Sequence, residues 1–277
     1  MAEDQFRRDY AAIAREFARQ AALRKNAHRY CKWVRLAARR HLEDLKRARQ
    51  RAWPYVYDEW HANDVCDFVE KLPHVEGVWD SPTITLSDWQ IFCLAMIFGW
   101  RRRADGLRRF TTVYLEVARK NGKSTLLAAI ALYCLCCEGE VGPQILIGAT
   151  TGDQAGKVFE PAKRMVQRTP DLCEAFGLQA WARSITCADN GGYIRPINAK
   201  SSTQDGHNPH VAILDELHAH KDRGLYDVLK SAFGARRNPL LIAITTAGYN
   251  VMGVCFEQRS FVTKVLEGLV EADHYWG

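Results

Sequence analysis

The run RKNGKST at residues 119–125 places a glycine, two lysines and two hydroxyl side chains close together. It follows the β-rich run TTVYLEV and opens the apolar helical run STLLAAIALY. A strand, a loop and a helix in this order are typical of a phosphate-binding P-loop. Backbone N–H groups of the loop and of the helix N-terminus can hold phosphate oxygens. We expect Lys123 to reach the β- and γ-phosphates and Ser124 to bind Mg²⁺.

One position of this loop departs from the usual pattern. Val117 stands where the first glycine is normally found, ahead of Gly122. The plain alternative is a glycine-led helix start with a surface lysine. The strand and the helix are placed correctly, so we favour a phosphate-binding loop of variant form. Its predicted binding residues are Lys120, Asn121, Gly122, Lys123, Ser124 and Thr125.

A second chemical signal is the apolar run VAIL at 211–214, which ends in Asp215 and Glu216. Parallel sheets place ligands beyond the carboxyl ends of their strands. Asp215 is predicted to hold Mg²⁺ directly or through water, and Glu216 to act as general base on the attacking water. An ordinary strand ending in a solvated acidic turn is the alternative, and the P-loop makes it less attractive.

A third apolar strand, at 240–244, ends in Thr245 and Thr246, followed by Gly248. Two hydroxyls at a strand end beside the acidic pair could sense a γ-phosphate. A plain exit from strand to turn explains them equally well.

Strands that alternate with helices must position these residues, and this alternation indicates a three-layer α/β fold with a mainly parallel sheet. Helices are also expected at 56–72 and 87–100, before a basic loop at 101–109. The run NGG at 190–192 favours a hairpin between 185–187 and 193–197. The other expected strands are 111–117, 144–149, 211–214 and 240–245, and the other expected helices are 123–137, 154–168, 225–233 and 254–271.

The basic charge of the chain is concentrated at its N-terminus. The whole chain has 38 Lys and Arg against 32 Asp and Glu, a net charge of +6. Residues 1–52 carry 15 basic and 6 acidic residues, a balance of +9, which leaves −3 for the rest. Stripes of apolar residues predict two amphipathic helices in this segment. We therefore predict a basic helical arm at 1–52 and one α/β domain at 53–277.

Composition excludes several other classes of protein. With 47% hydrophobic and 25% charged residues, the chain is ordinary for a globular protein. The apolar run at 124–137 is too short to span a bilayer, and the N-terminus resembles no signal peptide. Nine cysteines without paired CxxC motifs favour neither a disulfide framework nor a zinc ribbon. A reducing cytoplasm fits best.

Taken together, the motifs resemble the ATPase domain of the large terminase subunit of tailed bacteriophages. The matching runs are ARKNGKST, VAILDELHAH and ITTAG, with LSDWQ upstream and QDGHNPH before the acidic strand. The resemblance covers about residues 53–277 and does not extend to the basic arm. It implies an ASCE-type P-loop fold that hydrolyses ATP with Mg²⁺ to move double-stranded DNA into a procapsid.

The resemblance also implies partners and a setting. They are double-stranded DNA, a portal protein, a small terminase subunit and further copies of the chain in a ring, without a membrane. The protein would act in the host cytoplasm and stay out of the mature virion. Full-length members carry a C-terminal nuclease domain. Only 29 residues follow Gly248, so we expect no nuclease activity from this chain.

Residue roles carried over from the family complete the expectation. Gln90 would read the adenine, and Arg119 would stabilise charge on the γ-phosphate beside Lys123 and the base Glu216. Thr245, Thr246 and Gly248 would couple hydrolysis to movement. An arginine from a neighbouring subunit would also act, with Arg164, Arg183 and Arg195 as candidates.

Three other functions fit parts of the sequence. The run DELH at 215–218 favours a DExH-type helicase, but about 225 residues hardly house two RecA-like domains. A non-catalytic nucleotide-binding adaptor is supported only by the altered P-loop. A small-molecule kinase would not need a glutamate placed to activate water. The histidines His207, His210, His218 and His220 fit no zinc motif and are interpreted as lining a nucleotide site.

Overall fold

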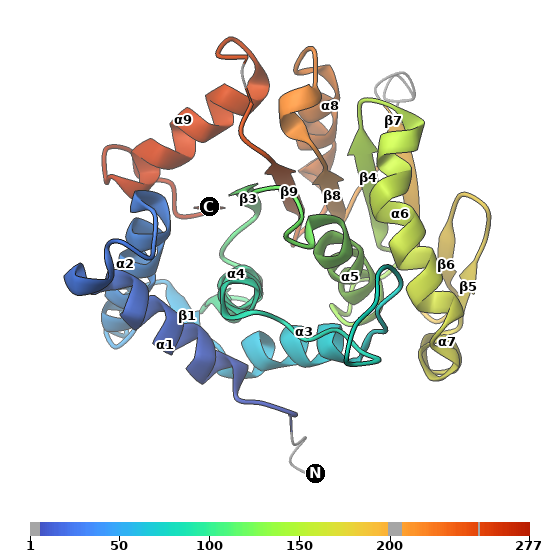
Figure 1. Cartoon of the computed structure of the whole chain (residues 1–277), viewed down its shortest axis with the longest axis horizontal. Helices are drawn as coiled ribbons and strands as arrows, with labels where there is room; N and C mark the ends of the chain where they lie inside the picture. Colours follow the sequence, from blue (N-terminus) through green and yellow to red (C-terminus); the bar gives the residue numbers. More distant parts are fainter. Residues whose placement is uncertain (1–5, 199–206, 249) are drawn as a thin grey trace. The chain divides into compact units, whose positions relative to one another are not determined.

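The computed structural model describes residues 6–198, 207–248 and 250–277 (Figure 1). The chain packs as two compact units. The first comprises Met1–Lys71, Thr85–Phe110 and Phe261–Gly277, and the second comprises Leu72–Ile84 and Thr111–Ser260. Of the predicted loop QDGHNPH, residues 204–206 lie outside the described part. None of the helices that the structure describes is both long and apolar enough to cross a membrane.

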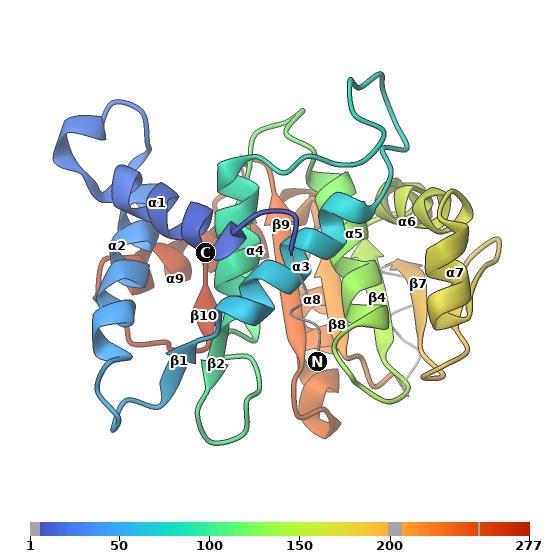
Figure 2. The ribbon, with the colours of Figure 1, turned by 90° about the horizontal axis from the view of Figure 1, so that it is seen from below.

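The first unit is built mainly of four helices (Figure 2). They are α1 (Tyr10–Ala22), α2 (Lys32–Arg47), α3 (Glu59–Lys71) and α4 (Asp88–Gly99), with a 3-10 turn at Arg24–Asn26. The two helices predicted within residues 1–52 are confirmed. The predicted start of a helix at Val56 is wrong, because β1 (Tyr55–Tyr57) pairs antiparallel with β2 (Trp100–Arg102). The strand β2 also occupies the start of the predicted basic loop.

The basic N-terminal segment packs within this unit. The alanine face of α1 is fully buried, and α1 packs against α3 and α4. On α3, Glu70 accepts a hydrogen bond from the Tyr10 hydroxyl and forms an ion pair with Arg8, both over 2.8 Å. Arg7 also donates to the carbonyl oxygen of Glu70 over 2.9 Å. Part of the positive charge therefore holds the helices together.

The buried side chain of Arg109 contacts residues of both α2 and the C-terminal segment of the chain. Arg109 forms an ion pair with Asp44 over 2.7 Å, and both side chains are almost fully buried. The guanidinium also contacts Asp273 over 3.1 Å. It lies 4.4–5.5 Å from the centres of four aromatic rings, those of Trp53, Tyr55, Trp100 and Phe110. Cation–π attraction and the ion pair together offset the cost of burying this charge.

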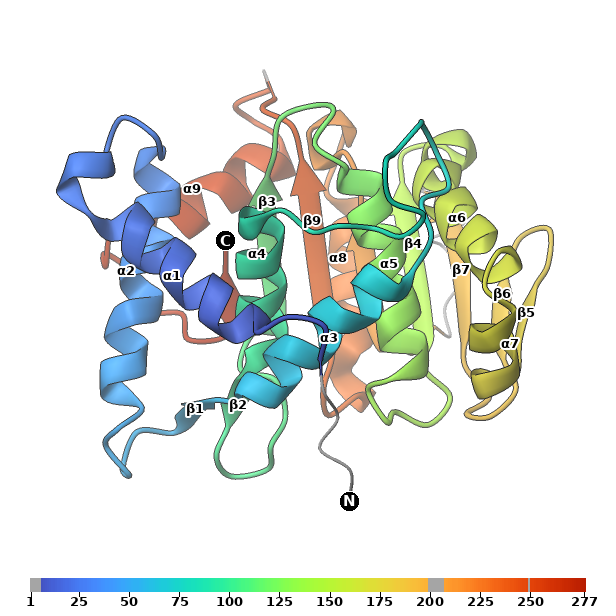
Figure 3. The same ribbon diagram turned by 60° about the horizontal axis from the view of Figure 1, so that its bottom comes forward.

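The second unit contains a sheet in the order β3-β9-β8-β4-β7-β6-β5 (Figure 3). The first five strands are parallel, and β6 and β5 complete the edge as antiparallel strands. The mainly parallel sheet and the predicted hairpin of β6 and β7 are thus confirmed. The strands are β3 (Thr112–Glu116), β4 (Gln144–Ala149), β5 (Leu178–Ala180), β6 (Ile185–Cys187), β7 (Tyr193–Asn198), β8 (Val211–Leu214) and β9 (Leu240–Thr245).

Helices cover both faces of this sheet, as the three-layer prediction requires. In Figure 1, α5 (Lys123–Cys136) and α8 (Gly224–Ser231) lie on opposite sides of the row of strands. The helix α6 (Gly152–Gln167) packs beside α5. On the α8 side, Gly148 of β4 leaves room for Leu225, because an added Cβ would come within 3.1 Å of its Cδ2 atom.

The remaining elements of the chain are short or lie at its end. The helix α7 (Pro170–Phe176) and the strand β5 were not predicted. The helix α9 (Val254–Leu266) runs from the second unit into the first and ends before the predicted residue 271. The last strand is β10 (Tyr275–Trp276), and 3-10 turns occupy Leu217–Ala219 and Ala232–Ala235.

Candidate nucleotide-binding site

The three chemical signals of the sequence meet at one edge of the sheet. The strands β3, β9 and β8 are parallel neighbours, so their carboxyl ends lie side by side. The run after β3 is the glycine–lysine loop, β9 ends at Thr245, and β8 is followed by Asp215. The backbone N–H of Val117 donates to the carbonyl oxygen of Thr245 over 2.9 Å. The strand with the two threonines therefore lies between the loop and the acidic pair.

The loop closes without its first glycine because other residues make the turns. Lys120 and Gly122 both adopt left-handed backbone conformations, with φ of 65° and 69°. The side-chain amide of Asn121 donates to the carbonyl oxygens of Ala118 and Arg119, both over 3.1 Å. Such bonds from an asparagine to nearby backbone stabilise a tight turn. Asn121 therefore belongs to the structure of the loop, whatever it contacts in a ligand.

Lys123 begins α5 and is largely buried, with 8% of its surface exposed. Its ammonium group donates to the carbonyl oxygen of Ala118 over 3.5 Å, so the side chain folds back over the loop. Ser124 and Thr125 follow it in the first turn of the helix, where backbone N–H groups have no partner within the helix. A lysine over a helix N-terminus is an arrangement that attracts a phosphate.

Asp215 lies at the end of β8 with 4% of its surface exposed. Burial and the neighbouring charge of Glu216 raise its pKa to about 6, and Lys123 opposes the shift. Its Oδ1 atom accepts the backbone N–H of Glu216 over 2.8 Å. Glu216 has a φ of 48°, which is unusual for a residue with a side chain. Strained backbone of this kind is concentrated at functional sites.

His218 connects the acidic pair after β8 with the threonines at the end of β9. The Nδ1 atom of His218 lies 2.9 Å from Thr245 Oγ1 and 3.2 Å from Glu216 Oε2. The backbone N–H of His218 donates to the same threonine hydroxyl over 3.1 Å. Gly248 packs so closely on this histidine that an added Cβ would come within 2.7 Å of the His218 Cβ. The acidic turn and the TTAG run are therefore in direct contact.

A cavity of about 210 Å³ opens beside this contact. His218 and Gly248 line it together with Glu116 at the end of β3 and Arg259 on α9. Arg259 and Glu116 form an ion pair over 3.1 Å. This pair was not predicted, because its members are 143 residues apart and belong to no motif.

Gln90 and Arg119 were also predicted to take part in nucleotide binding. Gln90 belongs to the first unit, where its Oε1 atom accepts hydrogen bonds from the backbone and hydroxyl of Ser87, each over 2.9 Å. Both bonds cap the start of α4 and leave the amide Nε2 uninvolved. Arg119 is exposed in the loop. The roles predicted for both residues stay predictions.

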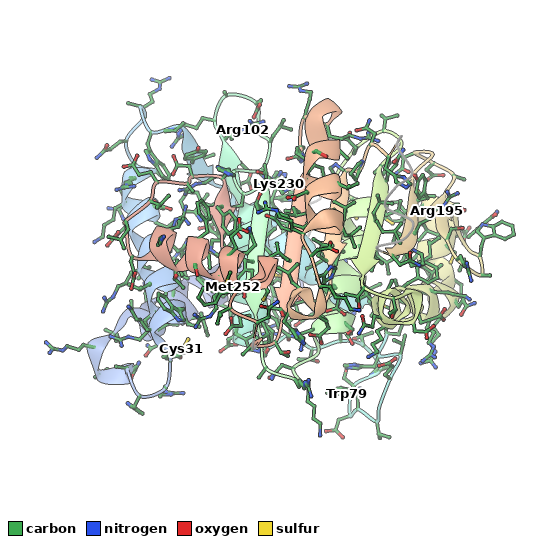
Figure 4. The ribbon with its side chains drawn as sticks, turned by 90° about the horizontal axis from the view of Figure 1, so that it is seen from above. Cys31, Trp79, Arg102, Arg195, Lys230 and Met252 are labelled. Atoms are coloured by element: carbon green, nitrogen blue, oxygen red, sulfur yellow. The ribbon has the colours of Figure 1, made fainter. Side chains whose placement is uncertain are left out.

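The arginines considered for action on a neighbouring subunit lie elsewhere in the second unit. Arg164 is within 3.7 Å of Glu76, and Arg183 lines a cavity beside α6. Arg195 on β7, labelled in Figure 4, stacks over the Tyr193 ring. No contact described in this structure distinguishes one of the three.

The predicted histidine cluster does not form a metal site among the described residues. His210 is buried against Glu138 over 2.9 Å and immediately precedes β8, at the other end of the strand from Asp215. His220 lies 3.4 Å from the carbonyl oxygen of Asp215. Of these histidines, His218 makes the most contacts with the predicted site. Sequence analysis did not distinguish it from the other three.

The fold and this site agree with comparisons to known proteins. Residues 88–264 match the family described as "Terminase large subunit, ATPase domain". The terminase large subunit of Enterobacteria phage HK97 is 35% identical over 141 residues, which are 49% of this chain and 28% of that protein. Protein YmfN of Escherichia coli (strain K12) is 47% identical over 73 residues, which are 26% of this chain and 16% of that protein.

A solved structure agrees as well. The crystal structure of the HK97 bacteriophage large terminase superposes with a TM-score of 0.64 and 26% identity, over 78% of this chain and 43% of that one. The chain thus spans less than a third of the length of the two curated relatives. The mainly parallel sheet, the P-loop and the match over most of the chain fit the ASCE-type fold expected from the motifs. The chain belongs to the family of terminase large subunit ATPase domains.

Proposed function

We propose that this chain binds ATP with Mg²⁺ and hydrolyses it, as the motor domain that drives double-stranded DNA into a procapsid. The observation that carries the proposal is the parallel order of β3, β9 and β8. This order gathers the lysine loop, the hydroxyl pair and the two carboxylates at one sheet edge. Phosphoryl transfer to water needs these parts, which position the reactants and stabilise charge.

Lys123, Ser124 and Asp215 would hold the triphosphate and its magnesium ion. The donor set fits a hard cation, because Mg²⁺ prefers carboxylate and hydroxyl oxygens and keeps several waters. Asp215 is a buried carboxylate whose raised pKa marks an environment in which a cation would be favourable. When bound, the ion would neutralise negative charge on the phosphates. The loop residues from Lys120 to Thr125 would surround the phosphates, and Arg119 would contact the γ-phosphate.

Glu216 is the general base of this proposal. Its Oε2 atom is buried, while 28% of the side chain is exposed. The other oxygen can therefore accept a proton from a water that attacks the γ-phosphorus. Thr245, Thr246 and Gly248 would transmit the change at the γ-phosphate to the rest of the domain. Gln90 would contact the adenine through its side-chain amide.

The partners of the proposal follow from the family. They are double-stranded DNA, a portal protein, a small terminase subunit and neighbouring copies in a ring, whose arginine would complete each site. Packaging would take place in the host cytoplasm. Four exposed cations lie within six residues at the end of α2 and in the turn after it, namely Lys46, Arg47, Arg49 and Arg51. Their density supports contact with DNA phosphates.

ATP binding and turnover by Lys123→Ala test the proposal. The wild-type chain should bind a fluorescent ATP analogue and release phosphate from ATP, with and without double-stranded DNA. Lys123→Ala should lose most of the binding, while the exposed Lys230→Ala serves as the matched control. The proposal fails if the wild-type chain neither binds nor hydrolyses ATP, at protein concentrations that allow association and in the presence of DNA.

A further inference from the structure

The imidazole of His218 lies between the ends of two neighbouring strands. Its Nδ1 atom is 2.9 Å from Thr245 Oγ1, at the end of β9, and 3.2 Å from Glu216 Oε2, which follows β8. It is also 3.5 Å from Thr246 Oγ1. A single ring nitrogen is thus within reach of the carboxylate proposed as base and of the hydroxyls proposed to couple hydrolysis to movement.

The bonds around Thr245 identify the nitrogen that carries the proton. A threonine hydroxyl has one proton to donate. Thr245 donates it to the carbonyl oxygen of Thr246 over 2.8 Å. Its oxygen is therefore the acceptor for both the backbone N–H and the ring of His218. This arrangement favours the tautomer in which Nδ1 of His218 carries the proton and donates.

Glu216 is the second acceptor within reach of this donor. Its Oε2 atom is buried and has no hydrogen-bond partner among the described residues. A buried carboxylate oxygen without a donor is unfavourable, and His218 Nδ1 is 3.2 Å away. A small rotation of either side chain would turn this contact into a hydrogen bond.

The backbone on both sides limits how far these groups can move. Asp215 holds the left-handed turn at Glu216 by accepting its N–H. Gly248 closes over His218, since a Cβ there would meet the His218 Cβ at 2.7 Å. Contacts made by the surrounding residues fix the orientation of a reacting side chain. The carboxylate and the imidazole are therefore confined to a small set of mutual positions.

We propose that His218 is the positioning residue of Glu216, and that its Nδ1–H is shared between the Glu216 carboxylate and the Thr245 hydroxyl. The inference rests on the proposed ATP hydrolysis. In that step the proton of the attacking water passes to Glu216 as the water oxygen bonds to the γ-phosphorus. The bond from the γ-phosphorus to the bridging oxygen breaks, and ADP leaves with that oxygen. His218 exchanges no proton with the reactants. It orients the base and connects it to β9.

Two substitutions separate this role from a purely structural one. His218→Ala removes the donor, while His218→Asn keeps an N–H near the position of Nδ1. Misplacing a reacting group by about 1 Å can cost about 10²-fold in rate. We expect His218→Ala to lower kcat for ATP by about this factor, with nucleotide affinity close to wild type. His218→Asn should recover much of the rate, and the exposed His28→Ala is the control.

The outcomes distinguish this inference from the proposed function. A His218→Ala protein with wild-type kcat, beside an inactive Glu216→Gln protein, overturns the role of His218 and leaves ATP hydrolysis in place. Equal losses of kcat and nucleotide affinity in His218→Ala also overturn it, because they indicate a collapsed site. A wild-type protein without turnover overturns the proposed function, and the inference fails with it.

The protonation of the ring gives a readout independent of turnover. In ¹⁵N NMR of histidine-labelled protein, the His218 signals are identified by their absence in His218→Asn. The inference predicts a protonated Nδ1 at a pH where the imidazole is neutral. A neutral ring protonated at Nε2, with a bare Nδ1, contradicts it.

Discussion

The carboxylate of Asp215 accepts the backbone N–H of Glu216 over 2.8 Å, and so one acidic residue fixes the backbone of the next. The bond holds Glu216 in a left-handed conformation that carries its side chain toward His218. Two adjacent carboxylates thereby point to different surroundings. Asp215 is enclosed near Lys123, and Glu216 is partly open to solvent. The enclosed Asp215 is thus suited to bind a cation, and the partly exposed Glu216 is suited to contact a water molecule.

Burial of Asp215 should cost the protein stability near neutral pH. Its pKa is about 6 in the folded chain against an ordinary value of 3.8. The folded state therefore keeps a proton that the unfolded state releases, and stability falls as the pH rises through this interval. Without nucleotide or Mg²⁺, Asp215→Asn should raise the free energy of unfolding at pH 7.5 by about 1–3 kcal/mol.

Urea unfolding at two pH values checks this expectation. The gain from Asp215→Asn should shrink at pH 5, because the wild-type carboxyl is then protonated in the folded state. The matched control is Asp222→Asn, which alters an exposed carboxylate on the same loop. A gain that is equal at both pH values would show that burial of the charge is not its cause.

The contact between Gly248 and His218 should not tolerate a methyl group. A Cβ at residue 248 would lie 2.7 Å from the His218 Cβ. Gly248→Ala should therefore destabilise the protein by about 1–3 kcal/mol and displace the histidine. Gly156→Ala is the control, because an added Cβ there meets no atom within 4 Å and the residue lies in α6. It should be neutral or stabilising by up to about 1 kcal/mol. Thermal unfolding of the two variants decides, and equal stability would rule out the close contact.

The ion pair of Arg109 with Asp44 should be important for the first unit. Removing Asp44 leaves a buried guanidinium with Asp273 as its remaining carboxylate partner. Loss of one member of a buried pair typically costs about 3–5 kcal/mol, and we expect Asp44→Ala to fall near the lower value. Arg47→Ala removes a mostly exposed partner of the same carboxylate, 3.8 Å away, and should cost less than about 1 kcal/mol. Denaturant unfolding that ranks the two variants equally would contradict the role of burial.

Four exposed cations near the end of α2 should contact DNA. They are Lys46, Arg47, Arg49 and Arg51. Arg103 stabilises the turn after α2 by donating hydrogen bonds to the carbonyl oxygens of Ala48 and Trp53. Each lost phosphate contact lowers the salt dependence of the binding constant by about 0.9 in a plot of log K against log salt. Glutamine at all four positions should reduce this slope for double-stranded DNA and leave ATP binding intact.

A second set of four substitutions controls for net charge. Glutamine at Lys221, Lys230, Arg237 and Lys264 removes the same charge from exposed positions outside α2 and its turn. If both sets change the slope equally, the four cations near the end of α2 form no specific contact. If only the first set changes it, these four cations bind the phosphate backbone.

The sequence predicted those parts of the fold that repeat a simple pattern. Apolar strands that end in Asp215 or Thr245 were placed correctly, since such runs have few alternatives in an α/β chain. The short strands β1 and β2 were missed because their pairing depends on residues 45 positions apart, as between Val56 and Arg101.

In the candidate site too, residues within a short motif were predicted, and contacts between residues far apart in the sequence were not. The loop around Lys123 and the pair at Asp215 are local motifs, so spacing reveals them. The contact of His218 with Thr245 joins residues 27 positions apart through the sheet order. The pairing of Arg8 with Glu70 joins residues 62 positions apart, and it explains why a basic segment can be partly structural. Charge counted along a sequence cannot distinguish a cation that is paired from one that is free.

Whether Glu216 activates the attacking water is tested most directly by phosphate release from ATP, measured for the wild-type chain and for Glu216→Gln with Mg²⁺ and double-stranded DNA. A positioned general base contributes about 10²–10⁴-fold to the rate. We expect Glu216→Gln to bind ATP as tightly as the wild type and to hydrolyse it more slowly by a factor in that range. The exposed Glu174→Gln should match the wild type. Wild-type turnover by Glu216→Gln would contradict the claim that this carboxylate activates the attacking water.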